Sequence, residues 1–231
     1  MIYFNGRYSD EFGVYVESYP KRTLPSRKFE KVSIPGRNGD IIFAEDAYEN
    51  VSQEYEIYIS AKKEKLPNAA RAVAEWLCAP GYRRLEDDYD PEIFRLAAFQ
   101  NGAEIENYLS EYGRATLSFD CCPQRYLKSG ENEISLTSGQ TLINPTGFDA
   151  LPLITVTCSN GGTLSAGGKT ITIAGYTGTV IIDSEEMESY FGETSLNQYL
   201  SGTFPKLGKE TQISWSGGIS AVKIKPRWFE I

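Results

Sequence analysis

Residues 33–40 read Ser-Ile-Pro-Gly-Arg-Asn-Gly-Asp, and this stretch must reverse the chain between two apolar segments at 29–34 and 41–43. The proline fixes its own φ, and the two glycines accept positive φ, so the sequence predicts a β-hairpin with a stiff turn. Arg37 lies at the tip of that turn. A guanidinium presented in this way typically meets a carboxylate or a backbone carbonyl.

The composition favours a globular, β-rich fold. The chain has 231 residues, 41% of them hydrophobic, with 21 Gly, 15 Tyr and 11 Phe. No stretch resembles a membrane-spanning segment, and Met1–Arg7 lacks the basic-then-apolar order of a secretory signal. We therefore expect the chain to fold in a cytoplasm.

The first half contains the clearest local patterns. Residues 51–60 alternate between apolar and polar side chains, which predicts a half-buried strand. Apolar residues recur at helical spacing from Pro67 to Cys78, and Pro80-Gly81 ends this helix. Residues 86–92 form an acidic hairpin tip between strands at 84–85 and 93–97. Two further strands are expected at Ile105–Leu109 and Arg114–Cys121.

A polar, turn-rich joint at residues 128–132 predicts two domains, 1–130 and 131–231. The second contains short strands separated by Gly, Ser, Thr and Asn, which is typical of an antiparallel sandwich or jelly roll. Gly167-Gly168 predicts a two-residue hairpin turn. The expected strands are Leu153–Cys158, Lys169–Ile173, Thr179–Ile182, Gln212–Trp215 and Ile219–Ile224. The last five residues fit either domain.

The four cysteines do not form the pattern of a disulfide scaffold or a metal site. Cys78, Cys121, Cys122 and Cys158 include no C-x-x-C pair, and buried free thiols are the favoured reading. The chain has no histidine, which excludes imidazole ligands to zinc. No cofactor is predicted.

The charge disfavours nucleic acid as a bound ligand. The net charge is −8, and residues 1–130 and 131–231 each carry −4, so neither half is a basic module.

No enzyme activity is predicted, because without histidine the Ser-His and Cys-His nucleophile pairs are impossible. The cluster of Asp87, Asp88, Asp90 and Glu92 leaves three alternatives: a calcium site, a glycosidase carboxylate pair, or a solvated or subunit-facing acidic turn, which we favour. Residues 162–170 nearly match a P-loop, but Thr163 replaces its first glycine and a strand follows in place of a helix.

Aromatic side chains of the second half could stack on sugar rings, although most are expected in the core. They are Tyr176, Tyr190, Phe191, Tyr199, Trp215 and Trp228.

Several motifs follow one another in an order that resembles the distal tail (Dit) proteins of siphophages, and this resemblance covers nearly the whole chain. They are Phe12–Val16, Pro35–Gly39, Trp76-Leu77, Gly81–Arg83, Tyr89–Glu92, Phe119–Tyr126, Asn144–Thr146, Ala150–Ile154, Ile181–Glu185, Phe204–Leu207 and Pro226–Trp228. The resemblance implies a mainly β fold with one α-helix: an N-terminal β-sandwich or split barrel that forms rings, and a C-terminal galectin-like β-sandwich.

The resemblance also implies a structural function in the virion. Six copies would form a ring that contacts the tail tube protein, the tail-associated or tail fibre protein and the tape measure protein, with DNA passing through its lumen. The candidate subunit-contact residues are Arg37, Asn38, Asp88 and Asp90. The alternative function is a carbohydrate-binding module that contacts the host surface.

Overall fold

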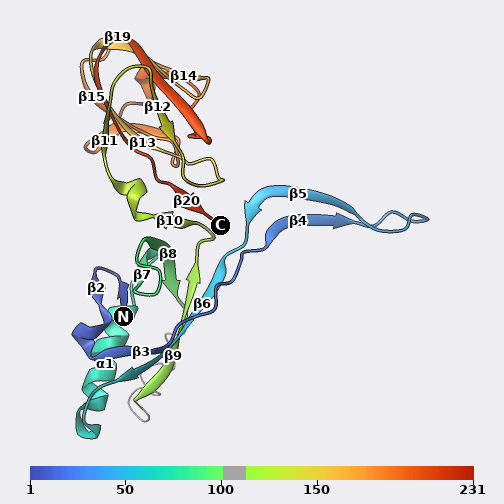
Figure 1. Ribbon diagram of the computed structural model, residues 1–231, viewed down its shortest axis with the longest axis vertical. Coiled ribbons are helices and arrows are strands. Elements are labelled where there is room, and N and C mark those ends of the chain that lie inside the picture. Colours follow the sequence, from blue (N-terminus) through green and yellow to red (C-terminus); the bar gives the residue numbers. More distant parts are fainter. Residues whose placement is uncertain (101–112) are drawn as a thin grey trace. The chain divides into compact units, whose positions relative to one another are not determined.

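The computed structural model describes residues 1–100 and 113–231, and the strand expected at Ile105–Leu109 lies outside them. The chain forms two compact units, Met1–Arg125 with Ile231, and Tyr126–Glu230. The predicted fold class is confirmed as mainly β, with one α-helix among the described residues (Figure 1). Within this described part, no helix has the length and apolar character needed to cross a bilayer.

The first unit is built on an antiparallel sheet in the order β2-β1-β7-β8-β9-β6-β3. Its strands are β1 (Ile2–Phe4), β2 (Arg7–Tyr8), β3 (Val14–Ser18), β6 (Val51–Ile59), β7 (Arg83–Asp87), β8 (Ile93–Phe99) and β9 (Arg114–Cys121). The strand predicted at 51–60 is confirmed as β6, in which buried and exposed residues alternate without exception. The acidic tip between β7 and β8 and the strand at 114–121 are also confirmed.

The predicted helix is confirmed as α1 (Leu66–Leu77), with a proline in its first turn. Its buried side chains, which include Val73 and Trp76, pack in the same core cluster as Phe4 and Phe119 of the sheet. The Trp76 indole Nε1–H donates a hydrogen bond of 2.8 Å to the Phe4 carbonyl, so the indole is buried without losing its partner. Short 3₁₀ helices lie at η1 (Ser9–Phe12) and η2 (Lys63–Lys65).

The second unit is organised by two long strands, β13 (Leu153–Ala166) and β19 (Glu210–Lys225). They pair with each other along most of their length, and each adds further antiparallel neighbours. The remaining elements are β10 (Arg125–Leu127), η3 (Lys128–Glu131), β11 (Ile134–Leu136), β12 (Gln140–Ile143), β14 (Lys169–Ala174), β15 (Gly178–Asp183), β16 (Glu188–Phe191), β17 (Thr194–Ser195), η4 (Asn197–Tyr199), β18 (Leu200–Gly202) and β20 (Phe229–Glu230).

The prediction of two strands at 212–215 and 219–224 is wrong, because β19 runs through both. Gly217 has φ +75° and lies opposite Gly162, where the register of the β13–β19 pair shifts. A Cβ on Gly218 would lie only 1.7 Å from the Ser159 carbonyl oxygen. The two glycines therefore form an irregularity within a continuous strand, where the local sequence suggested a turn. Gly167-Gly168 does form the predicted turn, since Ala166 pairs with Lys169.

The last residues divide between the two compact units, with Phe229 and Glu230 in the second and Ile231 in the first. β20 pairs with β10, and the Leu127 N–H donates to the Trp228 carbonyl at 2.8 Å. Trp228 is part of the buried core of the second unit, and Tyr176, Tyr199 and Trp215 are partly buried against this core. Phe191 departs from the expected burial, because 51% of it is exposed.

The cysteines are all free, but only two are buried. Cys121 and Cys158 are in the cores, Cys122 is half-buried, and Cys78 is exposed just beyond α1. The expectation of buried thiols is therefore wrong for Cys78, which follows the last helical residue and has left the apolar face. Burial raises the pKa of the Cys121 thiol to about 12, so this thiol is inert at neutral pH.

Candidate assembly surface

The predicted hairpin at 29–43 is confirmed as β4 (Arg27–Val32) paired with β5 (Ile41–Tyr48). Gly36 and Gly39 have φ of +83° and +81°, as the turn chemistry requires. Among the described strands, β4 and β5 pair only with each other, and Figure 1 draws them as a two-stranded ribbon. Isolated two-stranded hairpins are marginally stable in water, so this one needs a further surface to cover it.

Both faces of the hairpin expose apolar side chains, and each face also carries a charged residue of β4, Glu30 on one and Lys31 on the other. The register puts Val32 and Phe43 on one face, and Phe29 and Ile42 on the other. The exposed fraction is 38% for Val32, 57% for Phe43, 50% for Phe29 and 60% for Ile42. Exposed apolar residues grouped on one element are typical of a protein–protein contact. We call this set the hairpin patch.

The turn presents charge beside the hairpin patch. Arg37 and Asn38 are both exposed. The Arg37 backbone N–H donates to the Ile34 carbonyl at 3.2 Å, which closes the turn. Within residues 1–100 and 113–231, the Arg37 side chain makes no hydrogen bond or ion pair. It is therefore available to another chain.

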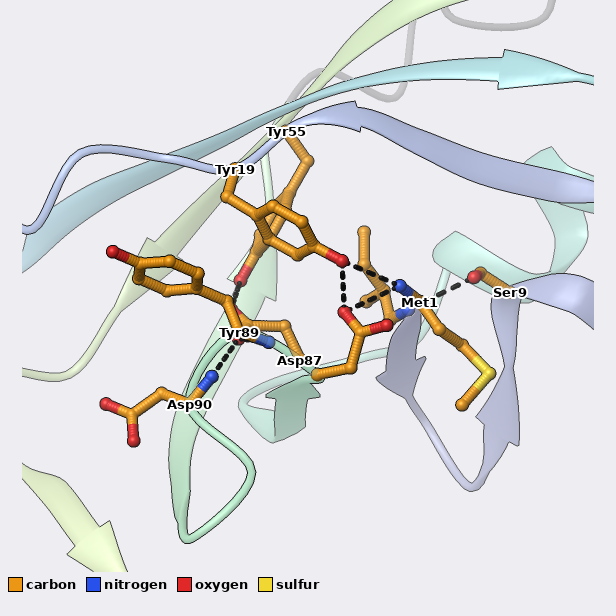
Figure 2. Close-up of polar contacts among 9 residues, drawn as sticks. Met1, Ser9, Tyr19, Tyr55, Asp87, Tyr89 and Asp90 are labelled. Atoms are coloured by element: carbon orange, nitrogen blue, oxygen red, sulfur yellow. Dashed lines mark hydrogen bonds and ion pairs between the residues drawn. The ribbon is translucent and has the colours of Figure 1, made fainter.

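The acidic turn is held by hydrogen bonds within its own unit (Figure 2). Asp87 accepts a bond of 2.7 Å from the Tyr55 hydroxyl and two more from the backbone N–H groups of Tyr89 and Asp90. Burial and then the charge of Asp87 raise the pKa of Tyr55 well above its usual value, so Tyr55 stays protonated and donates. Asp90 is paired with Arg125.

Asp88 contacts two other groups on the surface. It is bonded to the Tyr19 hydroxyl and lies 2.8 Å from the amino group of Met1. The hydrogen bond to Asp88 raises the pKa of Tyr19 to about 12. Burial alone would raise the pKa of Asp88, but these two partners outweigh it and lower that pKa.

These contacts bear on the three alternatives for the acidic cluster. Its aspartates bond to partners in the same unit, and among the described residues no three Cys, Asp or Glu side chains are grouped to hold a metal ion. The structure does not bring Asp88 and Asp90 to Arg37, and their role in a subunit contact stays a prediction. Local sequence patterns do not reveal Tyr19, Tyr55 and Arg125, because their partners lie 69, 32 and 35 residues away.

The hairpin patch could have been found from the sequence. Ile41, Ile42 and Phe43 are consecutive, and successive strand residues point to opposite faces, so an apolar run predicts two apolar faces. In a two-stranded hairpin both of these faces are open.

Two comparisons find that the chain is similar to phage tail proteins. The family model described as the phage tail protein RIFT-related domain matches residues 7–121 of the chain. No curated protein matches the sequence.

A solved structure shares the fold along the whole chain. The Dit protein (gp 19.1) of SPP1, described as a paradigm of the hub adsorption apparatus in phages that infect Gram-positive bacteria, matches with a TM-score of 0.74. The match covers 97% of each chain at 13% sequence identity, so it establishes the fold. The predicted resemblance to the siphophage distal tail family is confirmed.

Proposed function

We propose that the chain is a distal tail protein of a siphophage, with six copies in a ring that joins the tail tube to the host-adsorption apparatus. The hairpin patch is the observation that carries this proposal, because it leaves apolar side chains exposed on both faces of a ribbon that pairs with no further strand of the described residues. The matching family and the shared fold support the same conclusion. The function is structural, without catalysis.

In this proposal the first unit forms the ring. A cyclic ring of identical subunits gives each subunit two different contact surfaces, and the hairpin of one copy would lie on its neighbour. Each contact should bury on the order of 1,000 Å² or more. The tail tube protein, the tail-associated or fibre protein and the tape measure protein are the proposed partners, and DNA passes through the lumen without specific binding.

The ring itself is the first expected result. Sedimentation velocity of the purified chain, with negative-stain electron microscopy, should show a sixfold ring with a central lumen. A monomer that binds saccharides in a glycan-binding assay would instead support the alternative, a carbohydrate-binding module. A monomer without saccharide affinity, even after the tail tube protein is added, would contradict both functions.

Arg37→Ala should weaken ring assembly and leave the melting temperature of the subunit unchanged, because Arg37 has no side-chain partner within the described chain. A charge-assisted hydrogen bond contributes roughly 1.5–3 kcal/mol when partly buried, which corresponds to about a 10- to 150-fold change in the association constant. Arg37→Lys should restore assembly poorly, since an ammonium cannot form the two-pronged contact of a guanidinium. If all three proteins sediment equally from low to high salt, Arg37 has no part in ring assembly and the loop serves only as a turn.

A further inference from the structure

A pocket opens in the first unit beside the acidic turn. It has a volume of about 170 Å³ and is lined by residues of β6, β7 and β8 and of the segment that follows β3. Leu85 and Phe94 give it a buried apolar wall, and Arg95 and Arg125 bring positive charge to it. A single water needs only roughly 10–15 Å³, so the pocket can hold a larger group.

The acidic side chains of the lining are already engaged. Asp90 is paired with Arg125, and Glu86 is paired with Arg84. Asp87 accepts hydrogen bonds from Tyr55 and from two backbone N–H groups. These carboxylates therefore have partners other than Arg95.

Arg95 is the charged group of the lining that lacks such a partner. It is half-buried, and within residues 1–100 and 113–231 it makes no hydrogen bond or ion pair. Its Nη1 is fully enclosed by protein atoms and has no acceptor. Burial lowers the pKa of the Arg95 guanidinium, but an arginine side chain stays charged at neutral pH. A half-buried cation without an acceptor is costly, and such a group in a folded protein calls for a ligand.

We propose that this pocket binds a carboxylate on Arg95. Arg95 lines the pocket and its Nη1 is enclosed, so in this proposal the ligand is held by the other edge of the guanidinium, where the N–H groups of Nε and Nη2 are parallel. A planar carboxylate matches such a two-donor edge. In the assembled ring the carboxylate is an acidic side chain of the neighbouring copy of this chain, and this step rests on the proposed function.

Acetate tests the pocket without any assembly. The melting temperature of the full chain is compared in sodium acetate and in sodium chloride at pH 7 and equal ionic strength. Ligand binding to the folded state should raise the melting temperature in acetate by about 2 °C or more. Arg95→Met keeps the apolar stem and removes the charge, so it should abolish this difference.

Arg83→Met is the matched control, because Arg83 is an exposed arginine of the neighbouring strand β7 and lies outside the pocket. It should keep the acetate effect in full. If the Met variant does not fold, Arg95→Gln replaces it. An acetate effect of equal size in wild type and in the Arg95 variant would overturn the proposal, and so would the lack of any effect in wild type.

Assembly then identifies the source of the carboxylate. Acetate at constant ionic strength should compete with the side chain and lower the association constant of the wild-type ring, and Arg95→Met should lower it without any acetate dependence. If acetate binds on Arg95 but neither change affects assembly, the pocket stands and the side-chain source is overturned. If the wild type forms no ring under any condition, the proposed function fails while the acetate result still decides the pocket.

Discussion

Ile42→Asp is expected to abolish ring assembly while the melting temperature of the isolated subunit stays the same. Ile42 is 60% exposed in the hairpin, so the subunit loses little when the side chain changes. In a ring that covers this face, the change removes the burial of an isoleucine, about 1.5–3 kcal/mol, and adds the cost of burying a carboxylate. The association constant should fall by about 100-fold or more. Sedimentation velocity over a range of protein concentrations measures this loss.

Ile143→Asp is the matched control for that experiment. Ile143 is 68% exposed on β12 of the second unit, so it has the same chemistry and a similar exposure outside the proposed ring contact. It should assemble like wild type. Phe43→Asp tests the opposite face of the hairpin, and a defect as large as that of Ile42→Asp would mean that both faces are covered. If Ile42→Asp assembles normally, the hairpin patch is not the ring contact.

Local patterns explain how much of the fold could be predicted. The hairpin turn, α1 and β6 each follow from residues adjacent in sequence: a proline with two glycines, apolar residues at helical spacing, and strict alternation. Gly217-Gly218 shows the limit. Two glycines read locally as a turn, but the close approach of Ser159 on β13 turns them into an irregularity within a continuous strand.

The candidate site was less predictable, because residues far apart in the sequence come together in it only when the chain has folded. Arg37 could be placed on a turn from its own neighbours. The unpartnered state of Arg95 depends on the partners that Asp87 and Asp90 find elsewhere, namely Tyr55 and Arg125. Partner choice between residues more than 30 positions apart is decided by packing of the whole unit, and no local pattern encodes it.

The Arg227–Asp183 pair brings together two motifs of the distal tail resemblance, Pro226–Trp228 and Ile181–Glu185. Arg227 Nη1 lies 2.7 Å from Asp183 Oδ1, and Nη2 lies 2.9 Å from Oδ2, a two-pronged contact with a buried carboxylate. Nη1 also contacts Glu185, which accepts a hydrogen bond of 2.9 Å from the Tyr126 hydroxyl. The pair thus holds the C-terminal strand and the start of the second unit on the end of β15.

Arg227→Ala is expected to destabilise the second unit by on the order of 3 kcal/mol at pH 7, because Asp183 would be left buried without its counter-charge. Urea unfolding followed by circular dichroism and tryptophan fluorescence measures the change. Arg227 has φ +56°, so Arg227→Gly separates the two causes of strain and lost charge. Glycine accepts this φ without strain. If the ion pair is responsible, Arg227→Gly should therefore still show most of the destabilisation seen in Arg227→Ala. Lys223→Ala breaks the exposed Lys223–Glu133 pair of the same unit and should cost less than about 1 kcal/mol.

The pH dependence gives an independent check of the same pair. Burial alone would raise the pKa of Asp183, but the hydrogen bonds and charge of Arg227, with the N–H groups of Glu186 and Glu185, outweigh it and hold the pKa below its usual value of 3.8. A carboxyl whose pKa is lowered by folding stabilises the protein above its unfolded pKa, and this contribution is lost as the pH falls through the folded pKa. In Arg227→Ala the burial of Asp183 is no longer offset by the arginine, so its folded pKa should be higher than in wild type. The difference in stability between the two proteins should therefore be constant near neutral pH and shrink as the pH falls from this raised pKa to the lowered pKa of the wild type. A difference that stays the same from pH 7 to pH 2 would mean that Arg227 stabilises the unit through packing, and that Asp183 has no part in it.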